Sequence, residues 1–446
     1  MYVIFLLLIV LILLLVQLNL VDNDIFHPSV IVYACYALAL IFAVIEMDNW
    51  DIYISDKTFF IILTGLVIYM VISMMFRKTL FIIGKRNQET CTHSADETDI
   101  VDIQPLIMVF IDVFSLLIAL RYFLDIRRST GSLSGITSIS TMIYQYRVGS
   151  VNGTLESGLS SFSAHGFQIL FALTFICIYL IAINAVEKTQ KTIFWYLMRL
   201  IPIVCFLFCS LISGSRNPLL QVVLGSAVTV YIFMRAKNKF ERKFKLKSAF
   251  KFIVIGIIVL VIFVQLKDLL GRTTQYNFLE YIAEYIAAPI KNFDVFISKD
   301  LRNDSALWGR ETFVSIWKFI GSLTGKTELI NLPMNKEFNF LNGMSLGNVY
   351  TSFREYYYDF GLAGIIILTT IHSFIFTSLY ARLRKTSLNV FKTAINKKLL
   401  IYAFITQALF YFCVDDRLFQ AYLSQGNFEA IIFMLLFAVW LPRFKL

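Results

Sequence analysis

Charged side chains are scarce in this chain. Only 16% of its 446 residues are Asp, Glu, Lys or Arg, 58% are hydrophobic, and there are just 7 prolines and 6 cysteines. Soluble domains carry about 25% charged and about 45–50% apolar residues, so the composition excludes a soluble globular protein. It also excludes a disordered chain and a small secreted module held together by disulfides.

Long apolar runs account for the excess of hydrophobic residues. Most are about 20 residues long, enough to cross the hydrocarbon core of a bilayer as a helix, and none shows the alternation of a β-barrel strand. We therefore predict an all-α polytopic integral membrane protein with about 11 transmembrane helices. The predicted spans are residues 3–20, 29–45, 58–76, 106–122, 167–185, 193–213, 218–234, 252–270, 361–383, 399–412 and 428–441.

The net charge of +10 would suggest nucleic acid in a soluble protein. Here the Lys and Arg residues cluster between the apolar runs, where they indicate topology and contact with anionic membrane lipid. Segment 235–251, for example, carries eight basic residues and a single acid, Glu241. All the basic clusters fall on one side if the N-terminus is outside, so this side is predicted to be cytoplasmic and no nucleic-acid partner is expected.

Two long segments then lie on the extracytoplasmic side of a single membrane domain that covers residues 1–446. Segment 271–347 is predicted to be a large loop with amphipathic helices, and 123–166 is the second such loop. In the larger one Phe313, Ile316, Trp317 and Ile320 recur at helical spacing, and 276–293 is a second helical stretch. Long loops in compact bundles are more often functional than plain connectors.

The segment between the sixth and seventh predicted spans reads Ser-Gly-Ser-Arg-Asn-Pro. Asn217 suits an N-cap and Pro218 the first helical position. The start of a helix offers free N–H groups, and Arg216 adds a forked guanidinium, so the segment favours binding of a phosphate or diphosphate. An ordinary tight turn, with the arginine reaching lipid phosphate, explains the pattern equally well.

Three further arginines, Arg272, Arg310 and Arg354, lie on the same predicted side. Each alone is typical of a solvated charge. Together with Arg216 they would form a cationic pocket for a pyrophosphate-linked substrate.

Arg354 belongs to segment 348–361, which leads into the ninth predicted span. There Glu355 and Asp359 fall on one helical face. Two partly desolvated carboxylates repel each other, and one then holds its proton more tightly, as a general acid or base requires. Tyr350 and Tyr358 offer flat surfaces for sugar rings, although an aromatic belt at the membrane interface is the alternative.

Other polar groups are expected to have structural roles. His372 is interpreted as a satisfied core histidine, and the Asp415, Asp416, Arg417 group as a rim at the end of the tenth span. Cys91 and His93 lack a second ligand pair, so no metal site is predicted. Nucleotide-binding and serine-hydrolase motifs are also absent. Any reaction must therefore use a pre-energised substrate, without cofactors.

The Ser-Gly-Ser-Arg turn, the long external loop, Asn348-Val-Tyr-Thr and Asp359-Phe-Gly resemble features of the O-antigen and capsular polysaccharide repeat-unit polymerases. The likeness runs from about the fifth to the tenth span. Two Arg-(ten residues)-Gly patterns, Arg147 to Gly158 and Arg310 to Gly321, are of a kind noted in these polymerases.

The resemblance implies a GT-C-like helical glycosyltransferase at the outer face of the bacterial inner membrane, independent of metal and nucleotide. It would transfer a growing glycan from undecaprenyl diphosphate onto an incoming lipid-linked repeat unit, and a chain-length regulator would be a possible partner. Glu355 or Asp359 would be the base for the acceptor hydroxyl. The implied substrate-binding residues are Arg216, Arg272, Arg310, Arg354, Asn348, Tyr350 and Tyr358.

Two alternatives remain open. An O-antigen ligase of the same fold would carry a His-Asn pair before the equivalent helix start, where this chain has Gly347 and Asn348. A flippase or secondary transporter of lipid-linked sugars should place charges at mid-membrane and show pseudo-repeats. This chain instead gathers its arginines at the predicted outer surface.

Overall fold

The computed structural model describes residues 2–87, 100–131, 138–152, 155, 158–240, 261, 265, 278–341 and 344–444. Nearly all of the predicted eighth span lies outside these residues. So do Arg272 of the predicted diphosphate site and the Cys91, His93 pair.

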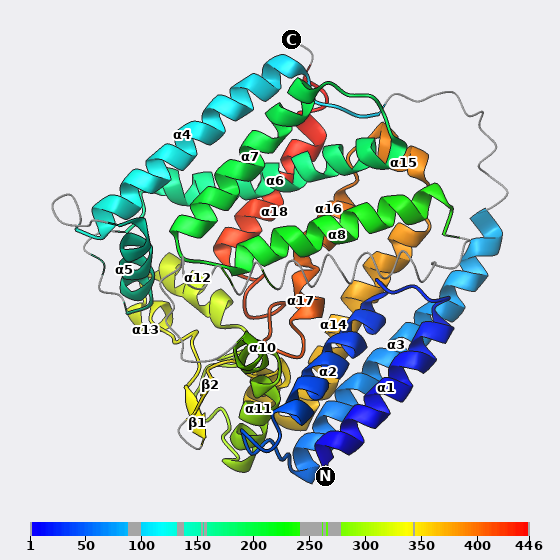
Figure 1. The fold of residues 1–446 in the computed structure, drawn as a ribbon, viewed down its shortest axis with the longest axis vertical. Coiled ribbons are helices and arrows are strands. Elements are labelled where there is room, and N and C mark those ends of the chain that lie inside the picture. The colour runs from blue at the N-terminus through cyan, green and yellow to red at the C-terminus, as the bar shows by residue number, and fades with distance from the viewer. Residues whose placement is uncertain are drawn as a thin grey trace.

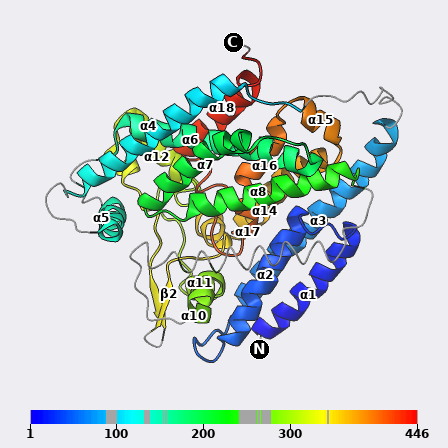
Figure 2. The same cartoon turned by 45° about the horizontal axis from the view of Figure 1, so that its top comes forward.

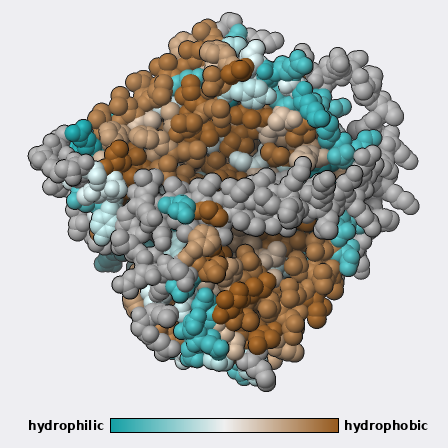
Figure 3. All heavy atoms as spheres, in the orientation of Figure 1, coloured by the Kyte–Doolittle hydropathy of each residue, from teal (hydrophilic) through white to brown (hydrophobic). Residues whose placement is uncertain are grey.

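Eight described helices are long and apolar enough to cross a membrane, and they correspond to eight of the predicted spans. Broad apolar areas cover the upper half and lower right of the molecular surface (Figure 3), as expected for helices that face lipid. The chain is therefore a multi-pass membrane protein. The eight helices are α1 (Tyr2–Leu20), α2 (Pro28–Ile45), α3 (Asp56–Asn87), α4 (Pro105–Ser129), α6 (Ser161–Glu187), α7 (Ile193–Ile212), α8 (Asn217–Lys237) and α14 (Phe353–Arg384).

The predicted tenth span is not one helix. It forms α16 (Lys397–Ile405) and the short α17 (Gln407–Phe410), and only the 16-residue α18 (Gln425–Trp440) follows. Side-chain amides bond the backbone at this break: Gln221 donates to the Phe404 carbonyl (2.8 Å) and Gln407 to the Asn217 carbonyl (3.1 Å). These bonds tie the broken segment to α8.

The helices form two groups (Figures 1 and 2). In one, α1, α2 and α3 pack together and α14 lies along α3. In the other, α6 contacts α4, α7, α8 and α18. Helix α16 contacts both α8 and α14, and so joins the two groups.

Smaller elements gather at one end of the molecule, at the lower left in Figure 1. The predicted helical stretch 276–293 is two helices, interrupted at Ala287, which pack against α2 and the short hairpin. Helix α12 begins directly after Phe313, close to the predicted position. The short α15 (Leu388–Thr393) lies at the opposite end. The gathered elements are α5 (Ile139–Asn152), α10 (Phe278–Ile286), α11 (Ala288–Ser298), α12 (Val314–Thr324), α13 (Thr327–Ile330) and the antiparallel strands β1 (Asn339–Leu341) and β2 (Met344–Gly347).

A kink divides α14. Gly361 has φ 63° and ψ −147°, a conformation that residues with a Cβ rarely adopt. The kink separates a polar two-turn helix, which carries Arg354, Glu355 and Asp359, from the apolar remainder. The predicted catalytic segment is therefore a short helix with its own direction.

Candidate active site

Arg354 lies in a cage of aromatic rings. It is only 6% exposed, and its guanidinium carbon lies 4.7 Å from the centroid of the Phe296 ring, 4.8 Å from Tyr350 and 5.9 Å from Tyr358. The i, i+4 spacing of Arg354 and Tyr358 on one helix accounts for the last of these contacts. Ring faces attract a cation, and the attraction strengthens when water is excluded.

A second carboxylate, Glu311, completes the environment of Arg354. The Arg354 guanidinium donates to Glu311, and Lys336 Nζ lies 2.6 Å from the same carboxylate oxygen. Burial alone would raise the pKa of Glu311, but the charges of Lys336 and Arg354 outweigh it and hold the pKa below its usual value. Glu311 therefore stays ionised at neutral pH.

Glu355 is fully buried beside this group. Its Oε1 lies 3.5 Å from Lys336 Nζ, and within the described residues neither carboxylate oxygen has a hydrogen bond. Buried polar atoms are nearly always hydrogen-bonded, so this carboxylate stands out as one that could accept a proton.

The Asp415, Asp416, Arg417 group is not a rim, which corrects the prediction. Asp416 is fully buried and accepts a hydrogen bond from Tyr356 (3.3 Å), while Arg417 pairs with Asp415 at 3.0 Å. Burial raises the pKa of Asp415 despite the nearby charges of Arg417 and Lys336. Burial and the neighbouring Glu355 raise the pKa of Asp416 well above its usual value.

Asp359 has a different environment from Glu355. It accepts hydrogen bonds from the backbone N–H groups of Glu311 (3.1 Å) and Thr312 (2.7 Å) and from the side chain of Asn303 (3.0 Å). These bonds fix the turn that presents Glu311 to Arg354. Asp359 is thus held by three N–H donors, whereas neither oxygen of Glu355 has a hydrogen bond among the described residues.

The remaining predicted residues of this segment lie nearby. The Tyr350 hydroxyl donates to the Glu337 carbonyl (3.0 Å) and accepts from Asn339 (3.0 Å), which orients its ring toward Arg354. Asn348 is half-buried directly after β2. Arg310, next to Glu311, is also half-buried and has no ion-pair partner among the residues that the structure describes.

Arg216 lies at the start of α8, as predicted, although the helix already includes Asn217. Its side chain is 5% exposed and donates to the hydroxyls of Tyr281 (2.8 Å) and Tyr285 (2.9 Å) on α10. The preceding turn needs Gly214, whose φ is +69° and against which the side chain of Arg147 packs. Arg147 from the predicted Arg-Gly pattern thus lies on the Arg216 turn.

A chain of contacts links the two arginine sites. Tyr411 donates to Asn217 (3.4 Å), beside Arg216, and the Arg417 guanidinium lies 4.9 Å from the centroid of the Tyr411 ring. Arg417 in turn pairs with Asp415, whose carbonyl accepts from Ser352, two residues before Arg354. Arg216 and Arg354 therefore stand at two ends of one polar network.

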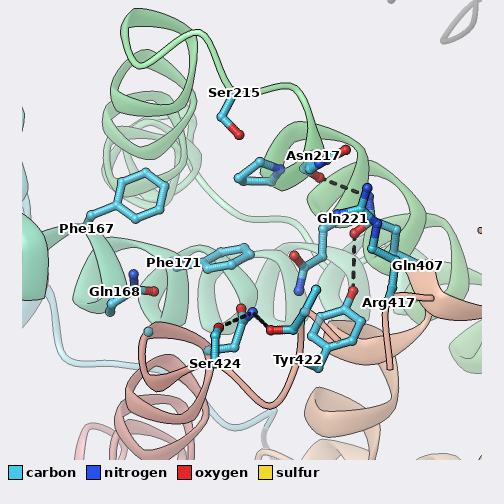
Figure 4. A pocket seen from close by; sticks show the side chains of 14 residues that line it. Phe167, Gln168, Phe171, Ser215, Asn217, Gln221, Gln407, Arg417, Tyr422 and Ser424 are labelled. Carbon is cyan, nitrogen blue, oxygen red and sulfur yellow. Dashed lines mark hydrogen bonds between the residues drawn. The ribbon is translucent and has the colours of Figure 1, made fainter. Parts of the chain in front are cut away.

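A pocket of about 190 Å³ opens on this network. It lies between α6, the start of α8, α17 and the segment before α18 (Figure 4). A larger cavity of about 470 Å³ lies elsewhere, beside Tyr380 and Arg384. Its lining does not include the charge cluster, which comprises Glu311, Lys336, Arg354, Glu355, Asp415 and Asp416. The amide side chains of the smaller pocket are Gln168, Asn217, Gln221, Gln407 and Asn427.

Neither Lys336 nor Glu311 was predicted as a site residue from the sequence. Neither carries a motif, and their partners are far along the chain, so no sequence pattern identifies them. One other prediction is confirmed, because His372 is buried and hydrogen-bonded to Tyr69. Across the described ranges, no group of three or more His, Cys, Asp or Glu could hold a metal ion.

The chain is similar in sequence to a curated protein of Escherichia coli (strain K12) named "Putative O-antigen polymerase". The two are 21% identical over 336 residues, which cover 75% of each chain. No protein-family model matches the chain, and no solved structure matches it. The resemblance drawn from the motifs is confirmed as a distant sequence similarity.

Proposed function

We propose that this chain is a GT-C-like glycosyltransferase that polymerises oligosaccharide repeat units linked to undecaprenyl diphosphate. The observation that carries the proposal is the placement of Arg354 directly beside Glu355 in the chain. Adjacent residues of one short helix place a caged cation next to a buried carboxylate without a hydrogen bond. An anion-binding group and a proton acceptor are what transfer from a lipid diphosphate requires. The distant likeness to an O-antigen polymerase supports the same reaction.

The proposed membrane is the bacterial inner membrane, with the charge cluster at its outer face. Lys and Arg concentrate in 235–251 and 382–398, and such segments favour the cytoplasmic side. The opposite end carries α10 to α13, the hairpin and the polar start of α14. Lipid-linked repeat units are then joined on the extracytoplasmic side of this membrane, away from nucleotide donors.

The chemical step needs one base and one anion site. The acceptor hydroxyl gives its proton to the Glu355 carboxylate, and its oxygen forms a bond to C1 of the donor sugar. The bond from C1 to the diphosphate oxygen breaks, and the electron pair leaves with the lipid diphosphate. Lys336, beside Glu355, favours the ionised base before the step.

The diphosphate is proposed to bind the arginines. The Arg354 guanidinium is paired with the Glu311 carboxylate. A phosphate group of the substrate would replace this carboxylate as the partner of the guanidinium. Arg310, half-buried next to Glu311, would add a second cation, and Arg216 and Arg272 would complete the site. Asn348, Tyr350 and Tyr358 would contact the sugar end of the substrate.

Complementation tests the proposal. The chain is expressed in a host that lacks its own repeat-unit polymerase and carries the cognate sugar genes, and glycan length is measured on a gel. We expect a ladder from the parent chain, and single capped units from Arg216→Ala and Arg354→Ala at equal protein levels. Arg382→Ala, which changes an exposed arginine at the far end of α14, should keep the ladder.

Two results would overturn the proposal. If the cognate repeat unit stays unpolymerised and lipid-linked sugar accumulates inside cells without the protein, the activity is that of a flippase. If no polymer forms, but single repeat units reach the final acceptor in a host that also lacks its own ligase, the activity is that of a ligase.

A further inference from the structure

We propose that the 190 Å³ pocket between α6, α8 and α17 binds one uncharged sugar ring of the acceptor repeat unit. This inference rests on the proposed function, which does not itself require such a pocket. It assigns the pocket as the place where the acceptor is selected.

The lining suits a ligand rich in hydroxyl groups. Five side-chain amides and the hydroxyls of Ser215 and Ser424 surround the space, together with the rings of Phe167 and Phe171. Amides both donate and accept, so they can match hydroxyls of either orientation. Apolar walls with a few convergent polar groups are typical of small-ligand sites.

The polar groups of the wall are held in place before any ligand binds. Gln407 donates to the Asn217 carbonyl (3.1 Å) and accepts from the Tyr422 hydroxyl (3.3 Å), and Asn427 donates to the Ala421 carbonyl (3.0 Å). Figure 4 shows Gln221 directed into the space beside Phe171. A ligand would meet donors and acceptors that are already ordered, which lowers the entropy lost on binding.

Charge argues for an uncharged ligand. Arg417 is the one charged side chain of the described lining, and it is already paired with Asp415 at 3.0 Å. An anion entering the pocket would have to break that pair and leave Asp415 buried without its partner. A lipid tail is disfavoured, because it would cover the Gln168 amide, which has no hydrogen-bond partner among the described residues, with hydrocarbon.

The position of the pocket, next to the charge cluster, suits binding of the acceptor repeat unit. Arg417 lines the pocket and contacts Asp415, and the Asp415 carbonyl accepts from Ser352, three residues before Glu355. The segment 415–417 therefore forms a wall shared by the pocket and the charge cluster. A ring bound on one side places the next sugar of the same glycan toward the proposed base on the other.

The test removes hydrogen-bonding groups without changing volume. Gln168 has no hydrogen-bond partner among the described residues, so Gln168→Leu should leave the fold intact, and Ser215→Ala removes one more hydroxyl. Gln190→Leu, an exposed site in the turn between α6 and α7, is the matched control. The probe is the lipid-free repeat-unit oligosaccharide, released by mild acid from the lipid-linked intermediate of a polymerase-deficient host.

Affinity for this oligosaccharide is measured by calorimetry on the purified protein, and affinity for undecaprenyl diphosphate is measured separately. Loss of one hydrogen bond predicts roughly three- to tenfold weaker oligosaccharide binding for Gln168→Leu, and a larger loss for the double variant. The KM for the acceptor should rise in parallel. Binding of undecaprenyl diphosphate to Gln168→Leu should not change, which also shows that this variant is folded.

The outcomes separate the two proposals. Unchanged oligosaccharide affinity in the double variant, or no binding by the parent, overturns the pocket assignment even if the parent polymerises glycan. Weaker binding in the variants, together with a parent that never polymerises its cognate unit, supports the pocket and overturns the polymerase assignment.

Discussion

Lys336 Nζ lies 3.5 Å from Glu355 Oε1 and 2.6 Å from Glu311 Oε2, so one buried ammonium serves two carboxylates. The Lys336 side chain is 8% exposed and that of Glu355 1%. Lys336 is thus the counter-charge of the buried Glu355 next to Arg354. This relationship decides how the site should respond to substitution.

Lys336→Met should destabilise the protein strongly. It removes one partner of a buried ion pair and leaves Glu355 without compensation, which costs about 3–5 kcal/mol. Unfolding of the purified protein in detergent measures the effect. Lys57→Met is the matched control, because Lys57 pairs with Asp300 at an exposed position where such pairs contribute little. Equal stability of the two variants would contradict a structural role for Lys336.

Glu355→Gln should abolish polymerisation while keeping the fold. The amide cannot accept the proton of the acceptor hydroxyl, and loss of a general base lowers the rate roughly 10²–10⁴-fold. Initial rates with purified lipid-linked repeat units measure the loss, and Glu429→Gln, at the partly exposed His165 pair, is the control. A Glu355→Gln protein with a near-normal rate would remove Glu355 as the base.

Asp359→Asn should act through the fold instead. An amide offers one acceptor oxygen where the carboxylate receives three N–H donors, so at least one buried donor loses its partner at about 1–3 kcal/mol. We expect lower thermal stability, and an activity that recovers on cooling. Asp304→Asn, an exposed site in the same loop, should change neither. Complete inactivity of a fully stable Asp359→Asn protein would instead assign Asp359 to catalysis.

Most of the helical architecture could be predicted because apolar length is a local property. The first predicted span, 3–20, differs from α1 (Tyr2–Leu20) by a single residue. The break in the tenth predicted span could not be predicted, because it depends on residues far away in the sequence. Gln221 of α8, for example, donates to the Phe404 carbonyl 183 positions along the chain. The predicted segment 399–412 has 14 residues, Thr406 and Gln407 among them, and is also short for a span.

The same limit applies to the site. The contact of Arg354 with Tyr358 follows from helical spacing, and the helix start beside Arg216 follows from the Asn-Pro pair. The contact of Glu311 with Arg354 joins residues 43 positions apart and that of Lys336 with Glu311 joins residues 25 apart. Only the folded chain brings these charges together, so their pairing has no periodic signature.

Asp416 predicts a pH dependence of stability. Burial and the neighbouring Glu355 raise its folded-state pKa well above the value of about 3.9 in the unfolded chain. Between these two values the folded protein holds a proton that the unfolded chain releases. The free energy of unfolding must therefore fall as the pH rises through this range. Asp415, whose pKa is raised in the same direction, adds to the decline.

Asp416→Asn should weaken this decline. Its amide stays neutral at every pH, and its oxygen can still accept from Tyr356 and from the N–H of Phe419, as Asp416 does. Melting temperatures from pH 5 to 9 should therefore fall less steeply for the variant than for the parent, and the difference should grow with pH. Glu311 does not mask the effect, because its lowered pKa removes stability only at pH values below about 4. Parallel curves for parent and variant would mean that Asp416 is already ionised in the folded protein, and that Glu355 shares its surroundings with a second buried negative charge.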